Sequence, residues 1–232
     1  MTSISREMRE ERMKRVFSEN EIISDRMYNL TMGAVVLYGL LVNVLLCRFG
    51  TSWVDSLSPI VFLIAYVVCA GAGIAITFKS QNPALSFLGY NLVVLPLGLV
   101  IAREVEYYGG IDSGVVLQAF IHTLGIVIIM VAASVAFPAF FEKLGSLLMI
   151  SLGAIIVVEL ICMIAGIGFN SNVIPTISAA LFSFYIGYDF WRSQQFCKTV
   201  DNAVDCALDI YLDIANLFLN LLRIFGNSKN KD

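Results

Sequence analysis

Four acidic side chains lie where the sequence is otherwise strongly apolar: Glu159, Asp189, Asp209 and Asp213. Burying a charge in the hydrocarbon of a membrane costs about 2.5 kcal/mol or more, so each of these acids is a hypothesis for a functional site. Carboxylates in this setting exchange protons, pair with a cation or coordinate a metal ion. The residue types therefore indicate proton and cation chemistry.

Aspartates recur at every fourth position near the C-terminus: Asp201, Asp205, Asp209 and Asp213. On an α-helix this spacing gives one slowly drifting stripe. Asp201 and Asp205 suit the first turns of a helix, because acids there offset the helix dipole. Asp213 follows Asp205 by eight residues, or about 12 Å along the axis, which is too deep for that role. We expect Asp213 to need a partner, a proton or water, with Asp205 and Asp209 as accessory acids.

Glu159 lies in a separate apolar run and allows two interpretations. It is either a second-site accessory acid or a protonated side chain that is bonded to another helix. The sequence does not decide between them.

The elements that must position these acids are membrane-spanning helices. Of 232 residues, 58% are hydrophobic and 14% are charged, whereas about 25% are charged in an ordinary soluble domain. The mean hydropathy is +0.81. A spanning helix needs about 20 apolar residues, and the sequence predicts seven such runs: 28–47, 56–78, 84–102, 114–137, 144–169, 172–191 and 203–225. The predicted fold class is an all-α polytopic membrane protein with a seven-transmembrane-helix bundle over residues 28–226.

Polar segments flank the predicted bundle. Residues 227–232 form a short polar tail, and residues 1–27 form a charged segment that we expect to be cytoplasmic. The mixture of basic residues with Met8, Met13, Val16 and Phe17 allows a helix on the membrane surface. The alternation of Glu with Arg equally allows a solvated tail.

The distribution of Lys and Arg predicts the orientation. With seven spans and a cytoplasmic N-terminus, ten of the 15 Lys and Arg residues lie on the cytoplasmic side. Positive charges gather on that side in membrane proteins. We therefore expect the N-terminus in the cytoplasm and the C-terminus outside, in the plasma membrane if the source is bacterial.

Several classes of function are not indicated. The five cysteines are scattered without CxxC spacing, and there is one histidine, so no zinc site or other cofactor is expected. A net charge of −3 gives no basic excess for nucleic acid. The expected partners are the lipid bilayer, calcium ions and protons, and the sequence does not identify protein partners.

The predicted topology brings two of the acids to the same side of the membrane. Asp189 ends the sixth span, Asp213 extends inward on the seventh, and Lys79 ends the second span at the same side. Two carboxylates held close together titrate as a unit, and a lysine within reach favours ionisation of one of them. The arrangement predicts a proton sensor, a cation site or both. Calcium is the ion that carboxylate oxygens suit.

The end of the chain resembles a known family. The sixth run ends in Phe184-Tyr185-Ile186-Gly187-Tyr188-Asp189, and the seventh contains Tyr211-Leu212-Asp213, Asn216-Leu217-Phe218, Leu221-Leu222-Arg223 and Gly226. These residues resemble the signature of the Bax-inhibitor (transmembrane Bax inhibitor motif) family, including its bacterial pH-sensitive calcium-leak members. Over the earlier helices the resemblance is mainly one of topology.

The resemblance implies a bundle with the seventh helix at its centre and a calcium leak that responds to pH. It places the family's paired aspartates at Asp189 and Asp213, which would sense protons and hold Ca²⁺. Lys79 stands about where the bacterial members carry an arginine that pairs with the sixth-helix aspartate. Lysine lacks the bidentate fork of arginine, so we expect a weaker latch.

Two other functions stay open from the sequence. An intramembrane aspartyl protease would also pair Tyr188-Asp189 with an aspartate in the seventh helix, but it would carry Gly-x-Gly before Asp213, where this chain has Ile210-Tyr211-Leu212. A non-transporting membrane regulator is the other alternative. We expect no enzymatic activity.

Overall fold

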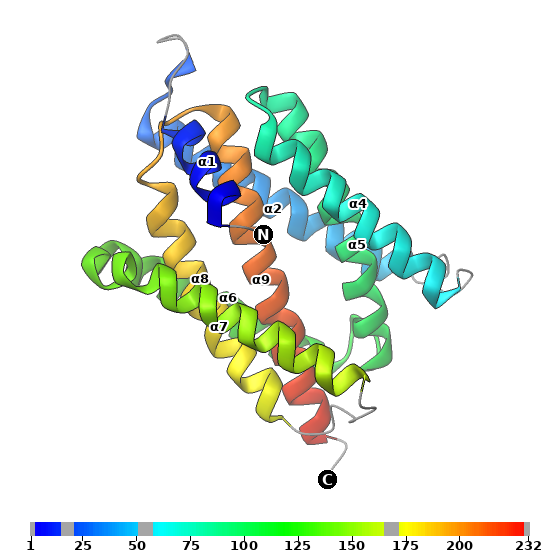
Figure 1. The fold of residues 1–232 in the computed structure, drawn as a ribbon. Coiled ribbons are helices and arrows are strands. Elements are labelled where there is room, and N and C mark those ends of the chain that lie inside the picture. The colour runs from blue at the N-terminus through cyan, green and yellow to red at the C-terminus, as the bar shows by residue number, and fades with distance from the viewer. Residues whose placement is uncertain (1–2, 15–20, 51–57, 165–171, 230–232) are drawn as a thin grey trace. The chain divides into compact units, whose positions relative to one another are not determined.

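The described part of the chain is entirely helical. The structure is a computed structural model, and it describes residues 3–14, 21–50, 58–164 and 172–229 (Figure 1). These residues form eight α-helices and no strand. The helices are α1 (Ser3–Met13), α2 (Asp25–Phe49), α4 (Pro59–Lys79), α5 (Pro83–Tyr107), α6 (Gly114–Ala136), α7 (Pro138–Ile164), α8 (Val173–Ser193) and α9 (Val200–Lys229). The predicted all-α class is confirmed.

Among the described residues, six helices are long and apolar enough to cross a membrane: α2, α4, α5, α6, α7 and α8. They coincide with the first six predicted spans, and only their ends differ. The seventh predicted span, 203–225, falls on α9, which is helical but is not among the six. Its aspartates make α9 more polar than the other long helices, so length and hydropathy alone do not identify it as a span.

Serine and proline fix where the helices begin. The hydroxyls of Ser24, Ser58 and Ser113 each accept a hydrogen bond from the backbone N–H three residues later, which caps α2, α4 and α6. Proline is the first residue of α4, α5 and α7, where its missing N–H is not needed. At Pro138 this begins α7 six residues before the predicted start of 144. The predicted end of that span at 169 lies outside the described residues.

The chain divides into two compact units. The first contains Met1–Arg103 and Ser193–Tyr211, and the second contains Glu104–Arg192 and Leu212–Asp232. Helix α9 therefore contributes its N-terminal part to the first unit and the rest to the second. The predicted division at residues 27 and 226 stays a prediction.

In the first unit, small residues bring α4 and α5 together. A Cβ atom added to Gly73 would lie 2.5 Å from the carbonyl oxygen of Gly89, and one added to Gly89 would lie 2.8 Å from that of Gly73. The two backbones are thus too close for any side chain at this crossing. Small residues serve this purpose in membrane helices generally, and the sequence Ala70-Gly71-Ala72-Gly73 predicts such an approach.

In the second unit, aromatic rings fill the space between α7 and α8. Phe141, Leu148, Leu181 and Tyr188 form a buried cluster. A Cβ on Gly187 would lie 2.3 Å from the Phe141 ring, and one on Gly145 would lie 2.6 Å from the Tyr188 hydroxyl. This packing fixes the backbone of α8 just before Asp189.

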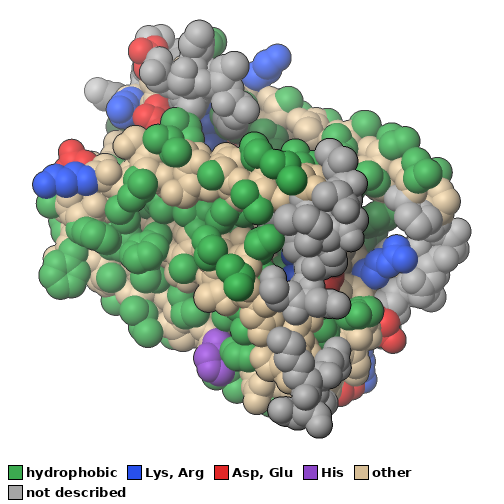
Figure 2. All heavy atoms as spheres, turned by 60° about the horizontal axis from the view of Figure 1, so that its bottom comes forward, with side chains coloured by type: hydrophobic (Ala, Val, Ile, Leu, Met, Phe, Trp, Pro, Cys, Tyr) green, Lys and Arg blue, Asp and Glu red, His purple; other side chains and the backbone are tan. Residues whose placement is uncertain are grey.

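The spanning helices present apolar side chains outward. Large exposed hydrophobic residues include Leu37 and Leu41 of α2, Leu63 and Val67 of α4, and Ile128 of α6. In the space-filling view, hydrophobic side chains cover much of the face that is seen (Figure 2). Such surfaces match a lipid environment, because water would disfavour so much exposed apolar area.

The glycine crossing gives a test of the α4–α5 packing. We expect Gly73→Ala to lower stability by about 1–3 kcal/mol, because the new methyl group forces two backbones apart. Gly71→Ala is the matched control, because a Cβ at Gly71 has nothing within 4 Å. Scanning fluorimetry of the protein in detergent measures both variants. Equal melting temperatures for the two variants would contradict the crossing.

Candidate functional site: the acidic stripe of α9

The four aspartates of α9, Asp201, Asp205, Asp209 and Asp213, form the acidic stripe, and all of them are largely shielded from solvent. Asp205 is fully buried, Asp201 and Asp213 are each 6% exposed, and Asp209 is half-buried. Every residue from 201 to 227 is buried or half-buried. Ionised acids in such surroundings need compensating charge or a proton.

Arg9 of α1 neutralises Asp209 in the first unit. Its Nη1 atom donates to both carboxylate oxygens, at 3.1 and 2.9 Å, and its Nη2 atom donates to the backbone carbonyl of Asp205 at 3.2 Å. The same guanidinium lies over the Phe78 ring of α4, 4.5 Å from the ring centroid. Only 7% of Arg9 is exposed, so this cation is held by charge pairing, hydrogen bonding and a cation–π contact together.

Arg12 neutralises the first two aspartates of the stripe. Its Nη2 atom is bonded to the Asp205 carboxylate, and its Nη1 atom lies 3.6 Å from Oδ2 of Asp201. The other carboxylate oxygen of Asp201 accepts a hydrogen bond of 2.7 Å from the Ser86 hydroxyl of α5. The N-terminal part of the stripe is therefore bound by two arginines of α1 and one hydroxyl.

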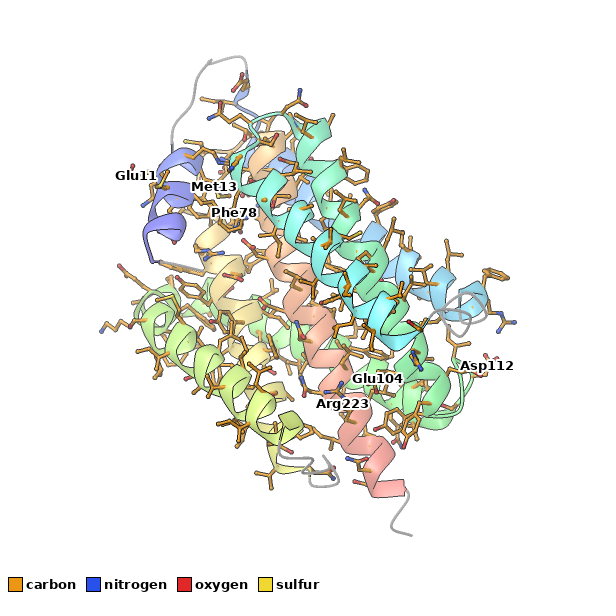
Figure 3. The ribbon with its side chains drawn as sticks, turned by 45° about the vertical axis from the view of Figure 1, so that its right-hand side comes forward. Glu11, Met13, Phe78, Glu104, Asp112 and Arg223 are labelled. Carbon is orange, nitrogen blue, oxygen red and sulfur yellow. The ribbon has the colours of Figure 1, made fainter. Side chains whose placement is uncertain are left out.

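The C-terminal end of α1 is bound as well. The amide of Asn202 donates to the Met13 carbonyl at 2.9 Å, and the backbone N–H of Cys197 donates to the same carbonyl at 3.0 Å. Met13 is 1% exposed. Figure 3 labels Met13 and Phe78 in this part of the first unit. Helix α1 is thus held on protein through Arg9, Arg12 and Met13. Neither predicted alternative, a surface helix or a solvated tail, includes the arginine contacts.

One ionisable group just before α9 is shifted by burial. Burial lowers the pKa of Lys198, whose ammonium group donates to the Gln194 carbonyl at 2.9 Å. The junction between α8 and α9 is therefore a poorly hydrated polar region.

The second unit contains the two aspartates that the sequence singles out. Asp189 of α8 is 7% exposed and pairs with Arg192, one turn later, at 3.1 Å. Asp213 of α9 is 6% exposed. That these two carboxylates act as a pair stays a prediction.

Other predicted site residues lie elsewhere or outside the description. Lys79 is the last residue of α4, in the first unit, and its side chain is exposed. Its predicted role as a latch stays a prediction. Glu159 belongs to α7, but its side chain lies outside the described residues.

Sequence reasoning missed the basic partners of these acids. Arg9 and Arg12 lie three residues apart, which places them on one face of a helix, and Arg192 follows Asp189 by three residues. These spacings were available as signals. What the pattern does not contain is the pairing of α1 with α9 across nearly the whole chain.

Comparison with known proteins identifies the family. The sequence profile of the family described as "Inhibitor of apoptosis-promoting Bax1" matches residues 20–230. The chain belongs to this Bax inhibitor family. The match includes α2 to α9 and begins after α1.

Relatives in the family are mostly bacterial membrane proteins. An uncharacterized protein of Helicobacter pylori is 32% identical over 182 residues, which is 74% of this chain and 73% of the relative. An uncharacterized membrane protein of Vibrio cholerae is 24% identical over 95% of both chains. A protein of vaccinia virus named as a Golgi anti-apoptotic protein is 27% identical over 75% of this chain and 72% of its own. With its six apolar helices, this Bax inhibitor family member is an integral membrane protein.

The burial of the Arg12 pair predicts a large effect on stability. We expect Arg12→Gln to cost about 3–5 kcal/mol, because it removes the ion-pair partner of the buried Asp205 carboxylate. Arg223→Gln is the comparison variant, because Arg223 pairs with Glu104 in the second unit at 3.1 Å, with exposures of 37% and 29% (Figure 3). A pair this exposed contributes about 0–1 kcal/mol.

Chemical denaturation in detergent micelles measures both variants. The double variant Arg12→Gln/Asp205→Asn should regain part of the loss, because the fully buried Asp205 charge is then removed together with its partner. Equal losses for Arg12→Gln and Arg223→Gln would show that the α1 pairs are not buried in solution.

Proposed function

We propose that this Bax inhibitor family protein is a passive Ca²⁺ leak pathway whose conductance is set by protonation of Asp189 and Asp213. The observation that supports it is the burial of both carboxylates within one unit, on α8 and α9. We infer that the two carboxylates lie close enough to titrate as a unit, because buried carboxylates that meet do not ionise together at low cost. A change of pH then changes the charge that a permeating cation meets.

In this proposal the closed state is held by ion pairs. One ionised acid shares a proton with the other, and a change of protonation breaks this arrangement. Arg192 supplies a cation to Asp189 at 3.1 Å. A latch through Lys79 stays a prediction. Ca²⁺ is the cargo, because it prefers carboxylate and carbonyl oxygens. The role is one of transport, without a cofactor, nucleic acid or catalysis.

We further propose that α9 is a seventh span at the centre of the bundle. Its 30 residues give a length of about 45 Å, enough to cross a bilayer. Its polar groups are acceptable in that place because residues 201–227 are all buried or half-buried. The topology then has a cytoplasmic N-terminus and an external C-terminus, and in a bacterial cell the membrane is the plasma membrane.

Calcium flux tests the gating pair. We expect wild-type protein in liposomes to carry Ca²⁺ at a rate that changes with pH, and Asp213→Asn to flatten that dependence because asparagine does not titrate. The control is Asp112→Asn, the same chemical change at an exposed residue in the turn between α5 and α6. Fluorescence of a calcium dye inside the vesicles, read at several pH values, gives the rates.

Each outcome has a distinct meaning. An unchanged pH profile in Asp213→Asn rules out the gating role. No flux from purified wild-type protein favours a non-transporting regulator, the kind of role that the name of the vaccinia relative suggests. Cleavage of a membrane substrate that is lost in Asp189→Ala would indicate the aspartyl protease instead.

Fluorescent-protein fusions test the seventh span. Green fluorescent protein fluoresces in the bacterial cytoplasm but not after export through the general secretion pathway. We expect a bright N-terminal fusion and a dark C-terminal fusion of the full chain. A bright C-terminal fusion would indicate that α9 does not cross the membrane.

A further inference from the structure

We propose that α1 is an autoinhibitory element, in which Arg9 and Arg12 occupy the N-terminal part of the acidic stripe as built-in substitutes for a permeating cation. The inference rests on the proposed cation flux, and it concerns residues that the gating pair does not include. All of the contacts that carry it lie within the first unit.

The first point is charge. Three carboxylates of the stripe, Asp201, Asp205 and Asp209, face two guanidinium groups of α1. Successive aspartates are about 6 Å apart along the helix axis, so their charges repel strongly where water is scarce. If α1 leaves, these acids must take up protons or other cations. The N-terminal part of α9 then attracts cations, whereas its charge is neutralised while α1 is bound.

The second point is that α1 suits reversible binding. It has 11 residues, and isolated helices of this length are marginal in water. Its order therefore depends on its contacts: the Arg9 and Arg12 pairs, the Phe78 ring and the Met13 carbonyl. Loss of the arginine pairs removes most of what holds it. While α1 is bound, the two guanidinium groups take the place beside these carboxylates that a mobile cation would need.

The third point is position in the chain. The family match begins at residue 20, so the aspartates lie inside the matched region and their arginine partners lie outside it. The conducting part is thus separable in sequence from the helix that covers the stripe. Helix α9 continues from Asp209 to Asp213 within one turn, so a change at α1 bears directly on the helix that carries a gating acid.

The test measures Ca²⁺ flux together with the labelling of Cys197, a native residue that reports whether α1 is bound. Cys197 is half-buried and donates its backbone N–H to the Met13 carbonyl and its thiol to the Lys14 carbonyl, so release of α1 frees this thiol from its acceptor. In Arg9→Gln/Arg12→Gln we expect Ca²⁺ flux into liposomes to rise by about tenfold, the change that loss of one charge-assisted bond gives. The rate of maleimide labelling of Cys197, read by mass spectrometry of its peptide, should rise in the same variant. Arg223→Gln, which breaks a pair in the second unit, should change neither.

Arg9→Lys/Arg12→Lys supplies the conservative variant and keeps the test usable if the glutamine variant does not fold. Lysine keeps the charge but not the forked geometry, so flux and labelling should lie between those of wild type and the glutamine variant. Faster Cys197 labelling with unchanged or lower flux would overturn autoinhibition. If wild-type flux responds to pH through Asp213 but neither α1 variant raises it, this inference alone fails. If no variant conducts, the proposed transport function fails as well.

Discussion

Charge compensation along α9 is the constraint on which the rest of the structure depends. A helix that is buried or half-buried from residue 201 to 227 carries four aspartates on one stripe. Each ionised carboxylate there must be paired, protonated or bound to a cation, since desolvation otherwise outweighs packing. The first unit meets this need with two arginines and a serine. Packing of α1 thus depends on the acids on α9, together with the buried Met13 side chain.

The periodicity of the sequence predicted much of this arrangement. Runs of apolar residues located six spans within a few residues, because the membrane sets both their length and their hydropathy. The spacing of four residues placed the aspartates on one stripe, because the direction of a side chain on a helix follows from its position in the sequence. The predicted identity of α9 as a span is the exception among the seven. The polar residues of α9 pair with residues of α1 and α5, and a hydropathy average over α9 does not include these partners. Composition alone therefore could not classify α9 as a span.

Contacts between distant segments were beyond the sequence pattern. Arg9 and Asp209 are 200 residues apart, and nothing in the spacing of one indicates the other. Sequence reasoning assigned Asp205 to the helix dipole, whereas the structure pairs it with Arg12 and buries it fully. A preference for acids in a first turn is worth a few tenths of a kcal/mol to about 1 kcal/mol. Breaking a buried ion pair costs much more free energy than this, so the pair with Arg12 determines the surroundings of Asp205.

The two ends of α9 therefore carry different kinds of ion pair. At its N-terminal end, Arg12 and Asp205 are almost excluded from solvent. Toward its C-terminal end, Arg223 and Glu104 are about a third exposed, so water and salt screen them. A change of charge breaks the exposed Arg223–Glu104 pair at a small cost in free energy, whereas breaking the buried Arg12–Asp205 pair has a large cost. Control of this helix by charge accordingly belongs at the α1 end, where breaking one contact uncovers several acids at once.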